Sequence, residues 1–101
     1  MSSTLQSTAP SLTADYPRAS LGHFPTPLEA LTRLSTEAGS QKPLWVKRDD
    51  CTGLAFGGNK VRQLEFYFGD ALAQGATLAL ITGAVQSNFV RTAAASAAKL
   101  G

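Results

Sequence analysis

Two stretches of the chain place apolar residues at the spacing of an amphipathic helix. The first stretch begins at Asn59 and ends at Gly75, and its apolar positions are Val61, Leu64, Phe68, Ala71 and Leu72. The second is an alanine-rich stretch from Phe89 to Leu100. Gly69 lies inside the first helix, where glycine costs about 1 kcal/mol relative to alanine, so we expect close packing or a bend there.

Two shorter stretches have the pattern of β-strands. Residues 44–48 alternate and are β-prone, whereas residues 78–82 are apolar without alternation, as in a strand covered on both faces. Strand, helix, strand and helix in this order predict an α/β fold with a parallel sheet. Two strands do not make a complete covered sheet, so the pattern predicts the front of a larger domain.

The N-terminal part of the chain has weaker signals. Residues 1–15 are rich in serine and threonine, and they predict a flexible tail. Three prolines between residues 16 and 27 favour extended or turn geometry. Leucines three positions apart from Leu28 to Leu34 then predict a helix that ends at Gly39.

Composition and charge exclude several classes of function. The chain has 101 residues, 44% of them hydrophobic, and a net charge of +2, which fits one small globular domain. It contains no basic run and no stretch of 18 apolar residues, so we expect neither nucleic acid nor a membrane as partner. The single cysteine, Cys51, allows no internal disulfide, and the single histidine, His23, has no second metal ligand at a suitable spacing. The expected compartment is the cytoplasm.

A lysine follows two glycines at the start of the first helix. Gly57 and Gly58 allow the backbone to approach a ligand closely or to adopt positive φ, and Asn59 suits a helix N-cap. The positive end of the helix dipole disfavours a second positive charge, and this favours the neutral amine that Schiff-base chemistry requires of Lys60. A surface lysine behind a flexible turn is the alternative.

Three small polar residues precede the second helix. Gln86, Ser87 and Asn88 follow the predicted strand at 78–82, where open α/β sheets bind ligands, and free helix amides there can bind an anion. Plain N-capping by Ser87 explains the same pattern. Arg91, one turn further along, is compatible with a side chain that faces solvent. Each feature alone is ordinary, and only their joint order is specific.

The run from Lys47 to Arg62, KRDDCTGLAFGGNKVR, and the later run from Gly83 to Asn88, GAVQSN, together resemble one group of pyridoxal-phosphate (PLP) enzymes. That group contains D-cysteine desulfhydrase, 1-aminocyclopropane-1-carboxylate deaminase and L-cysteate sulfo-lyase. The resemblance covers residues 16–101 and implies the N-terminal part of a catalytic domain. The implied fold is the three-layer parallel-sheet fold of tryptophan synthase β, PLP fold type II.

The resemblance also implies roles for single residues. Lys60 matches the lysine that forms a Schiff base with pyridoxal 5'-phosphate, and Asn88 matches the asparagine that hydrogen-bonds the cofactor's 3′ oxygen. Ser87 matches a serine that faces the substrate carboxylate and takes a catalytic part, and Gln86 matches a neighbour that lines the substrate pocket. The family's phosphate-binding loop, its partner for the pyridine nitrogen and its active-site tyrosines lie beyond Gly101.

The function implied is a PLP-dependent lyase that converts D-cysteine to pyruvate, hydrogen sulfide and ammonia by α,β-elimination. Deamination of aminocyclopropane carboxylate and release of sulfite from L-cysteate are alternatives within the family. A truncated, non-catalytic fragment is the alternative of another class. The resemblance implies a homodimer for the full-length form and an inactive isolated chain.

The chain departs from the family pattern at two positions. Phe89 stands where the family often has histidine or glutamine, and Gln63 stands where it often has lysine. We therefore expect an aromatic ring at the substrate side and one cation fewer near the cofactor phosphate.

Overall fold

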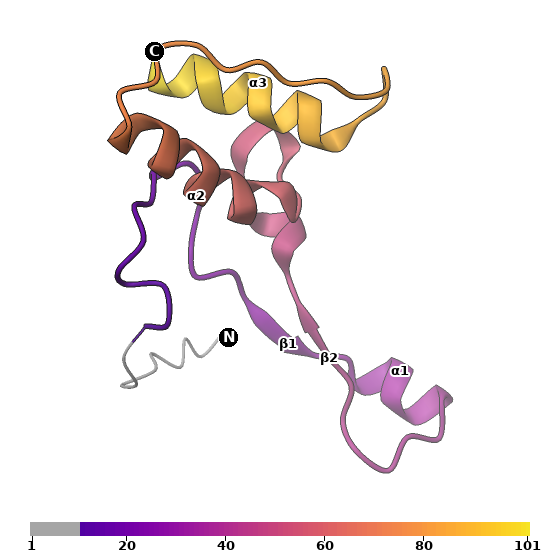
Figure 1. Cartoon of the computed structure of the whole chain (residues 1–101). Helices are drawn as coiled ribbons and strands as arrows, with labels where there is room; N and C mark the ends of the chain where they lie inside the picture. Colours follow the sequence, from indigo (N-terminus) through magenta and orange to yellow (C-terminus); the bar gives the residue numbers. More distant parts are fainter. Residues whose placement is uncertain (1–10) are drawn as a thin grey trace.

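The computed structural model describes residues 11–101, so most of the tail predicted for residues 1–15 lies outside the described residues. The elements, in chain order, are β1 (Leu28–Ala30), α1 (Thr32–Glu37), β2 (Trp45–Lys47), the 3₁₀ turns η1 (Asp49–Cys51) and η2 (Leu54–Phe56), α2 (Lys60–Ala73) and α3 (Asn88–Leu100). Helices α2 and α3 pack together, and β1, β2 and α1 lead away from them (Figure 1). None of the described helices is long and apolar enough to cross a membrane.

The two predicted long helices are confirmed. Helix α2, Lys60–Ala73, lies within the predicted range from Asn59 to Gly75, and α3 starts one residue before Phe89. Ser87 caps α3, because its Oγ accepts a hydrogen bond from the amide of Val90 at 3.2 Å. Asn59 occupies the N-cap position of α2, as predicted, but its side chain makes no capping hydrogen bond.

The first predicted strand is confirmed, and the helix expected after Pro27 is shorter than predicted. Strand β2 lies within residues 44–48 and pairs antiparallel with β1, with Glu29 opposite Val46. The leucine spacing predicted a helix from Leu28, but Leu28–Ala30 is strand β1 and the helix begins only at Thr32. Pairing with β2 gives these three residues backbone partners that outweigh a weak helical pattern.

The strand predicted over residues 78–82 is wrong for this chain. The segment between α2 and α3 runs along α3 without regular structure (Figure 1). A strand needs a neighbouring strand for its amides and carbonyls, and the sole sheet in residues 11–101 is the β1–β2 pair. Leu78 and Leu80 are consequently 76% and 87% exposed. The described residues therefore hold an antiparallel ribbon and no parallel sheet.

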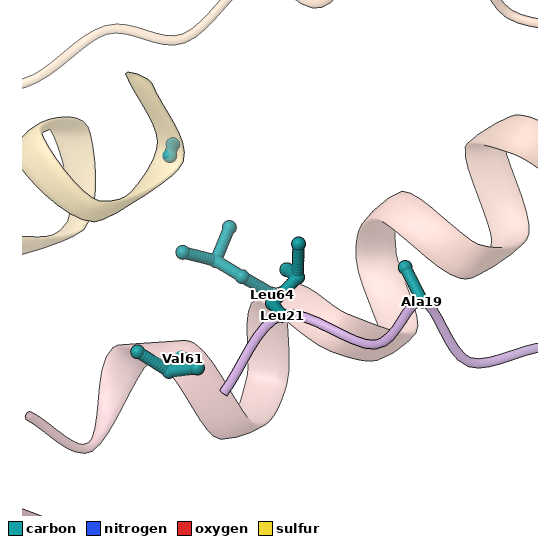
Figure 2. Packing of buried hydrophobic residues seen from close by; sticks show 5 residues of the cluster. Ala19, Leu21, Val61 and Leu64 are labelled. Carbon is teal, nitrogen blue, oxygen red and sulfur yellow. The ribbon is translucent and has the colours of Figure 1, made fainter. Parts of the chain in front are cut away.

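The core forms where the N-terminal segment crosses α2 and α3. Figure 2 shows Ala19 and Leu21 of that segment against Val61 and Leu64 of α2, and Ala93 of α3 completes the cluster. All five side chains are less than 9% exposed. These contacts fix the start of α2 relative to α3.

Gly69 confirms the close packing expected inside α2. A Cβ at this position would lie 2.5 Å from the carbonyl oxygen of Pro17 and 2.7 Å from the Cα of Arg18. Both are backbone atoms, so the neighbouring segment cannot yield by turning a side chain. The glycine therefore lets the N-terminal segment lie directly on the helix.

Glu65 attaches the same segment through polar contacts. Its side chain is 2% exposed, and it accepts hydrogen bonds from the amides of Leu21 at 2.8 Å and Gly22 at 3.0 Å. The Nε of Arg18 donates to its other oxygen. A buried carboxylate is tolerated because it is paired and hydrogen-bonded in this way.

Candidate functional site

A tight loop, residues 49–59, leads into Lys60 and is called the Lys60 loop. The loop folds through η1 and η2, and Gly57 then takes a φ of +78°. A Cβ at Gly57 would collide with the carbonyl oxygen of Asp50, so glycine is required there both by conformation and by space. Gly58 follows with a φ of +121° and nothing within 4 Å of where its Cβ would be. The backbone before Lys60 is therefore open on that side.

Lys60 is the first residue of α2. It is half-buried, and within residues 11–101 its ammonium has no hydrogen bond or ion pair. A primary amine in this position is free to react with an aldehyde.

The turn before α3 presents the other predicted site residues. Ser87 is half-buried and caps the helix, whereas Gln86 and Asn88 are exposed. In the described part of the chain, the amides of Asn88 and Phe89 have no hydrogen-bond acceptor, as is usual for the first turn of a helix. Such amides bind anions, and the helix dipole adds to the attraction.

Arg91 connects the two predicted motifs. Its Nη1 donates to Oδ1 of Asn88 at 3.1 Å, and its Nη2 reaches the carbonyl oxygen of Gly57 at 3.4 Å. The starts of α2 and α3 are thus neighbours, with the Lys60 loop beside Asn88. This contact was not predictable from the sequence, because a cation one turn into a helix is typical of an exposed surface.

A second group of polar residues surrounds the start of α2. Arg62 donates from Nε and Nη2 to the carboxylate of Asp49, at 3.0 and 2.7 Å. The hydroxyl of Thr26 donates to the same carboxylate at 2.7 Å. The Arg62 guanidinium, with help from Thr26, lowers the pKa of Asp49 to about 2. Sequence reasoning did not find this group, since its members are up to 36 residues apart.

Phe89 packs against α2, and its expected place at the substrate side stays a prediction. Its ring packs edge-on against Tyr67, with 6.4 Å between the ring centroids, and it lines an apolar pocket of about 370 Å³ beside α2. Leu64 and Ile81 line the same pocket. In this chain Phe89 is thus part of the packing between α3 and α2. Gln63 is exposed.

Comparison with known proteins places this site in context. Residues 19–101 match the family described as pyridoxal-phosphate dependent enzyme. The chain is 55% identical over 86 residues to the D-cysteine desulfhydrase of Klebsiella pneumoniae, which covers 85% of this chain and 26% of that enzyme. It is 54% identical over 88 residues to the Yersinia enterocolitica D-cysteine desulfhydrase, with 87% of this chain and 26% of that enzyme covered.

A solved structure has the same fold. The crystal structure of an ACC deaminase homologue superposes with a TM-score of 0.79 and 44% identity, over 88% of this chain and 27% of that one. The chain therefore spans about a quarter of the length of the relatives it matches. Its fold is an N-terminal portion of PLP fold type II, as the resemblance implied. The match over residues 19–101 includes both motifs, and the chain belongs to the family of pyridoxal-phosphate dependent enzymes.

Proposed function

We propose that residues 16–101 supply the lysine-bearing part of a PLP-dependent lyase whose substrate is D-cysteine. The products are pyruvate, hydrogen sulfide and ammonia. The observation that carries the proposal is the contact through Arg91, which brings the Lys60 loop beside Asn88 at the start of α3. The desulfhydrases that are 53–55% identical to this chain supply the choice of substrate.

The residues at this site fit the cofactor. Pyridoxal phosphate is an anionic aldehyde, and the site offers a free primary amine at Lys60 together with unpaired amides at the start of α3. The open backbone at Gly58 leaves room for a flat ring to approach. When bound, the cofactor withdraws electrons from the substrate's α-carbon.

The remaining steps belong to the side chains of the chain itself. The Nζ of Lys60 takes the α-proton of the substrate and holds it. Ser87, Asn88 and Gln86 would bind and orient the reactants: the Ser87 hydroxyl would hold the substrate carboxylate, the Asn88 amide would hold the cofactor's 3′ oxygen, and Gln86 would line the substrate pocket. This fixed orientation favours cleavage of the bond to the α-proton over cleavage of the other bonds at the α-carbon. We further propose that the full-length form is a cytoplasmic homodimer.

Deamination of aminocyclopropane carboxylate is the second candidate. The structural similarity to an ACC deaminase homologue favours it. The two activities are separated by supplying each substrate in turn, because only the desulfhydrase reaction releases hydrogen sulfide. A non-catalytic fragment remains the alternative for the isolated chain, for which we expect neither stable cofactor binding nor turnover.

The proposal is tested in a chimera in which this chain replaces the matching quarter of the Klebsiella pneumoniae D-cysteine desulfhydrase. The chimera should show the absorbance band of a lysine-bound cofactor and should release pyruvate from D-cysteine. In Lys60→Ala the band and the activity should both disappear. Lys42→Ala, an exposed lysine between α1 and β2, is the matched control and should retain both. A band that survives in Lys60→Ala would contradict the assignment of Lys60.

A further inference from the structure

Asp49 contacts the chain on both sides of Lys60. Its backbone carbonyl accepts a hydrogen bond from the amide of Gly58 at 3.1 Å, two residues before the lysine. Its side-chain carboxylate accepts two bonds from Arg62, two residues after the lysine. One residue therefore fixes both ends of the five-residue segment that carries Lys60.

The contact to Arg62 has a geometry that resists rotation. The Nε and Nη2 atoms of the guanidinium each meet a different oxygen of Asp49, at 3.0 and 2.7 Å, so the pair forms a two-point fork. The Arg62 guanidinium also lies 4.8 Å from the centroid of the Phe24 ring. Asp49 is 23% and Arg62 42% exposed, so the pair is shielded on the Asp49 side.

The carboxylate is itself held from a third direction. The hydroxyl of Thr26, a residue that is 4% exposed, donates to Oδ1 of Asp49 at 2.7 Å. Thr26 lies just before β1, and the Lys47 ammonium of β2 donates to its carbonyl oxygen at 2.5 Å. Asp49 thus ties the start of α2 to the base of the β1–β2 ribbon.

The charge of Asp49 also suits its position. Arg62 in the first turn of α2 adds a positive charge where the helix dipole is already positive, which is unfavourable by itself. The Asp49 carboxylate offsets both charges. Two other charged side chains act on the Asp49–Arg62 pair through space: Lys47 acts on Asp49, and Glu65 acts on Arg62.

We propose that Asp49 is a positioning residue for Lys60, and that the Asp49–Arg62 fork sets the distance and direction from which the Lys60 amine reaches the cofactor and substrate. This inference rests on the proposed function of Lys60. A displacement of about 1 Å at a reacting group can lower a rate about 100-fold, so loosening the fork should reduce turnover with little loss of binding.

The test uses the chimera described above, with saturating pyridoxal phosphate. In Asp49→Asn an amide group faces the guanidinium, and in Arg62→Lys a single ammonium replaces the two-point fork. Each variant should lower kcat about 10- to 100-fold, with KM changed less. The double variant should lose no more than the worse single variant, because both break one interaction. Asp50→Asn is the matched control, since within residues 11–101 the Asp50 side chain contacts only the half-buried Arg48 and the Cys51 thiol, and kcat should stay within about 2-fold.

A spectroscopic readout separates positioning from mere stability. The visible circular dichroism of the bound cofactor, divided by its absorbance, reports how firmly it is oriented, and we expect this ratio to fall in Asp49→Asn and Arg62→Lys. If Asp49→Asn does not fold, Arg62→Lys decides by the same two measurements. An unchanged kcat and ratio, or an equal loss in Asp50→Asn, overturns the positioning role. A cofactor band that survives in Lys60→Ala instead overturns the assignment of Lys60, so the two failures are distinguishable.

Discussion

Glu65 offers a local test of how the N-terminal segment is held on α2. Replacement by alanine leaves the buried amide of Leu21 and the part-buried amide of Gly22 without an acceptor. An unsatisfied buried donor costs about 1–3 kcal/mol, so the two together cost on the order of 4 kcal/mol. The lost partner of Arg18 adds little, because that side chain is 38% exposed.

Replacement of Glu65 by glutamine should destabilise the attachment of the N-terminal segment less than replacement by alanine. The amide oxygen can take the place of the oxygen that receives both backbone amides, but its NH₂ group then faces the Arg18 Nε, donor against donor. Charge-assisted hydrogen bonds are about twice as strong as neutral ones, so we expect a loss of roughly 1–2 kcal/mol.

Hydrogen exchange at the Leu21 and Gly22 amides of the chimera measures these losses locally, without requiring that the whole enzyme unfold reversibly. Since 1.4 kcal/mol is a factor of about ten, exchange should accelerate roughly 5- to 30-fold in Glu65→Gln and more than about 100-fold in Glu65→Ala. Asp70→Asn is the control, because in the described part of the chain this exposed carboxylate on α2 contacts only Gln74. Exchange in Glu65→Ala as slow as in Asp70→Asn would refute the reasoning.

Two further predictions concern the site. The folded-state pKa of Asp49 is about 2, below its ordinary 3.8, so its pairing with Arg62 stabilises the fold above about pH 4 and is lost as pH falls toward 2. The difference in denaturant midpoint between the chimera and its Arg62→Gln variant should accordingly shrink over that range, and a constant difference would contradict the assignment. Ser87→Ala should cost about 1 kcal/mol through loss of the α3 cap, whereas Ser87→Asp keeps the cap. Turnover lost in both variants would show a role beyond capping, and turnover kept in Ser87→Asp would exclude one.

The elements predictable from the sequence are those whose signal is local. Helices α2 and α3 have a strong period and, for α3, a serine cap, so their positions follow from residues a few places apart. The positive φ of Gly57 was also predictable, because glycine favours this backbone conformation. Lys60 and Ser87 were identified by their order along the chain, not by any contact between them.

The features that the sequence missed depend on residues distant in the chain. The segment 78–82 has the composition of a strand, but a strand also requires a partner, and composition does not supply one. The contact between Asp49 and Arg62 spans 13 residues, and that between Arg18 and Glu65 spans 47. Nothing in the local pattern of these charged residues distinguishes them from surface residues.

The unpaired segment between α2 and α3 has a consequence for handling the protein. Residues 71–90 contain no charged residue and no proline, the types that usually interrupt aggregation-prone stretches. Within this stretch Leu78 and Leu80 are exposed, and their backbone has no strand beside it. A second chain could therefore add to it edge to edge, as in amyloid-like association. Whatever covers this segment in the larger fold also protects it against self-association. The contact that completes the sheet is therefore also the contact that keeps the protein soluble.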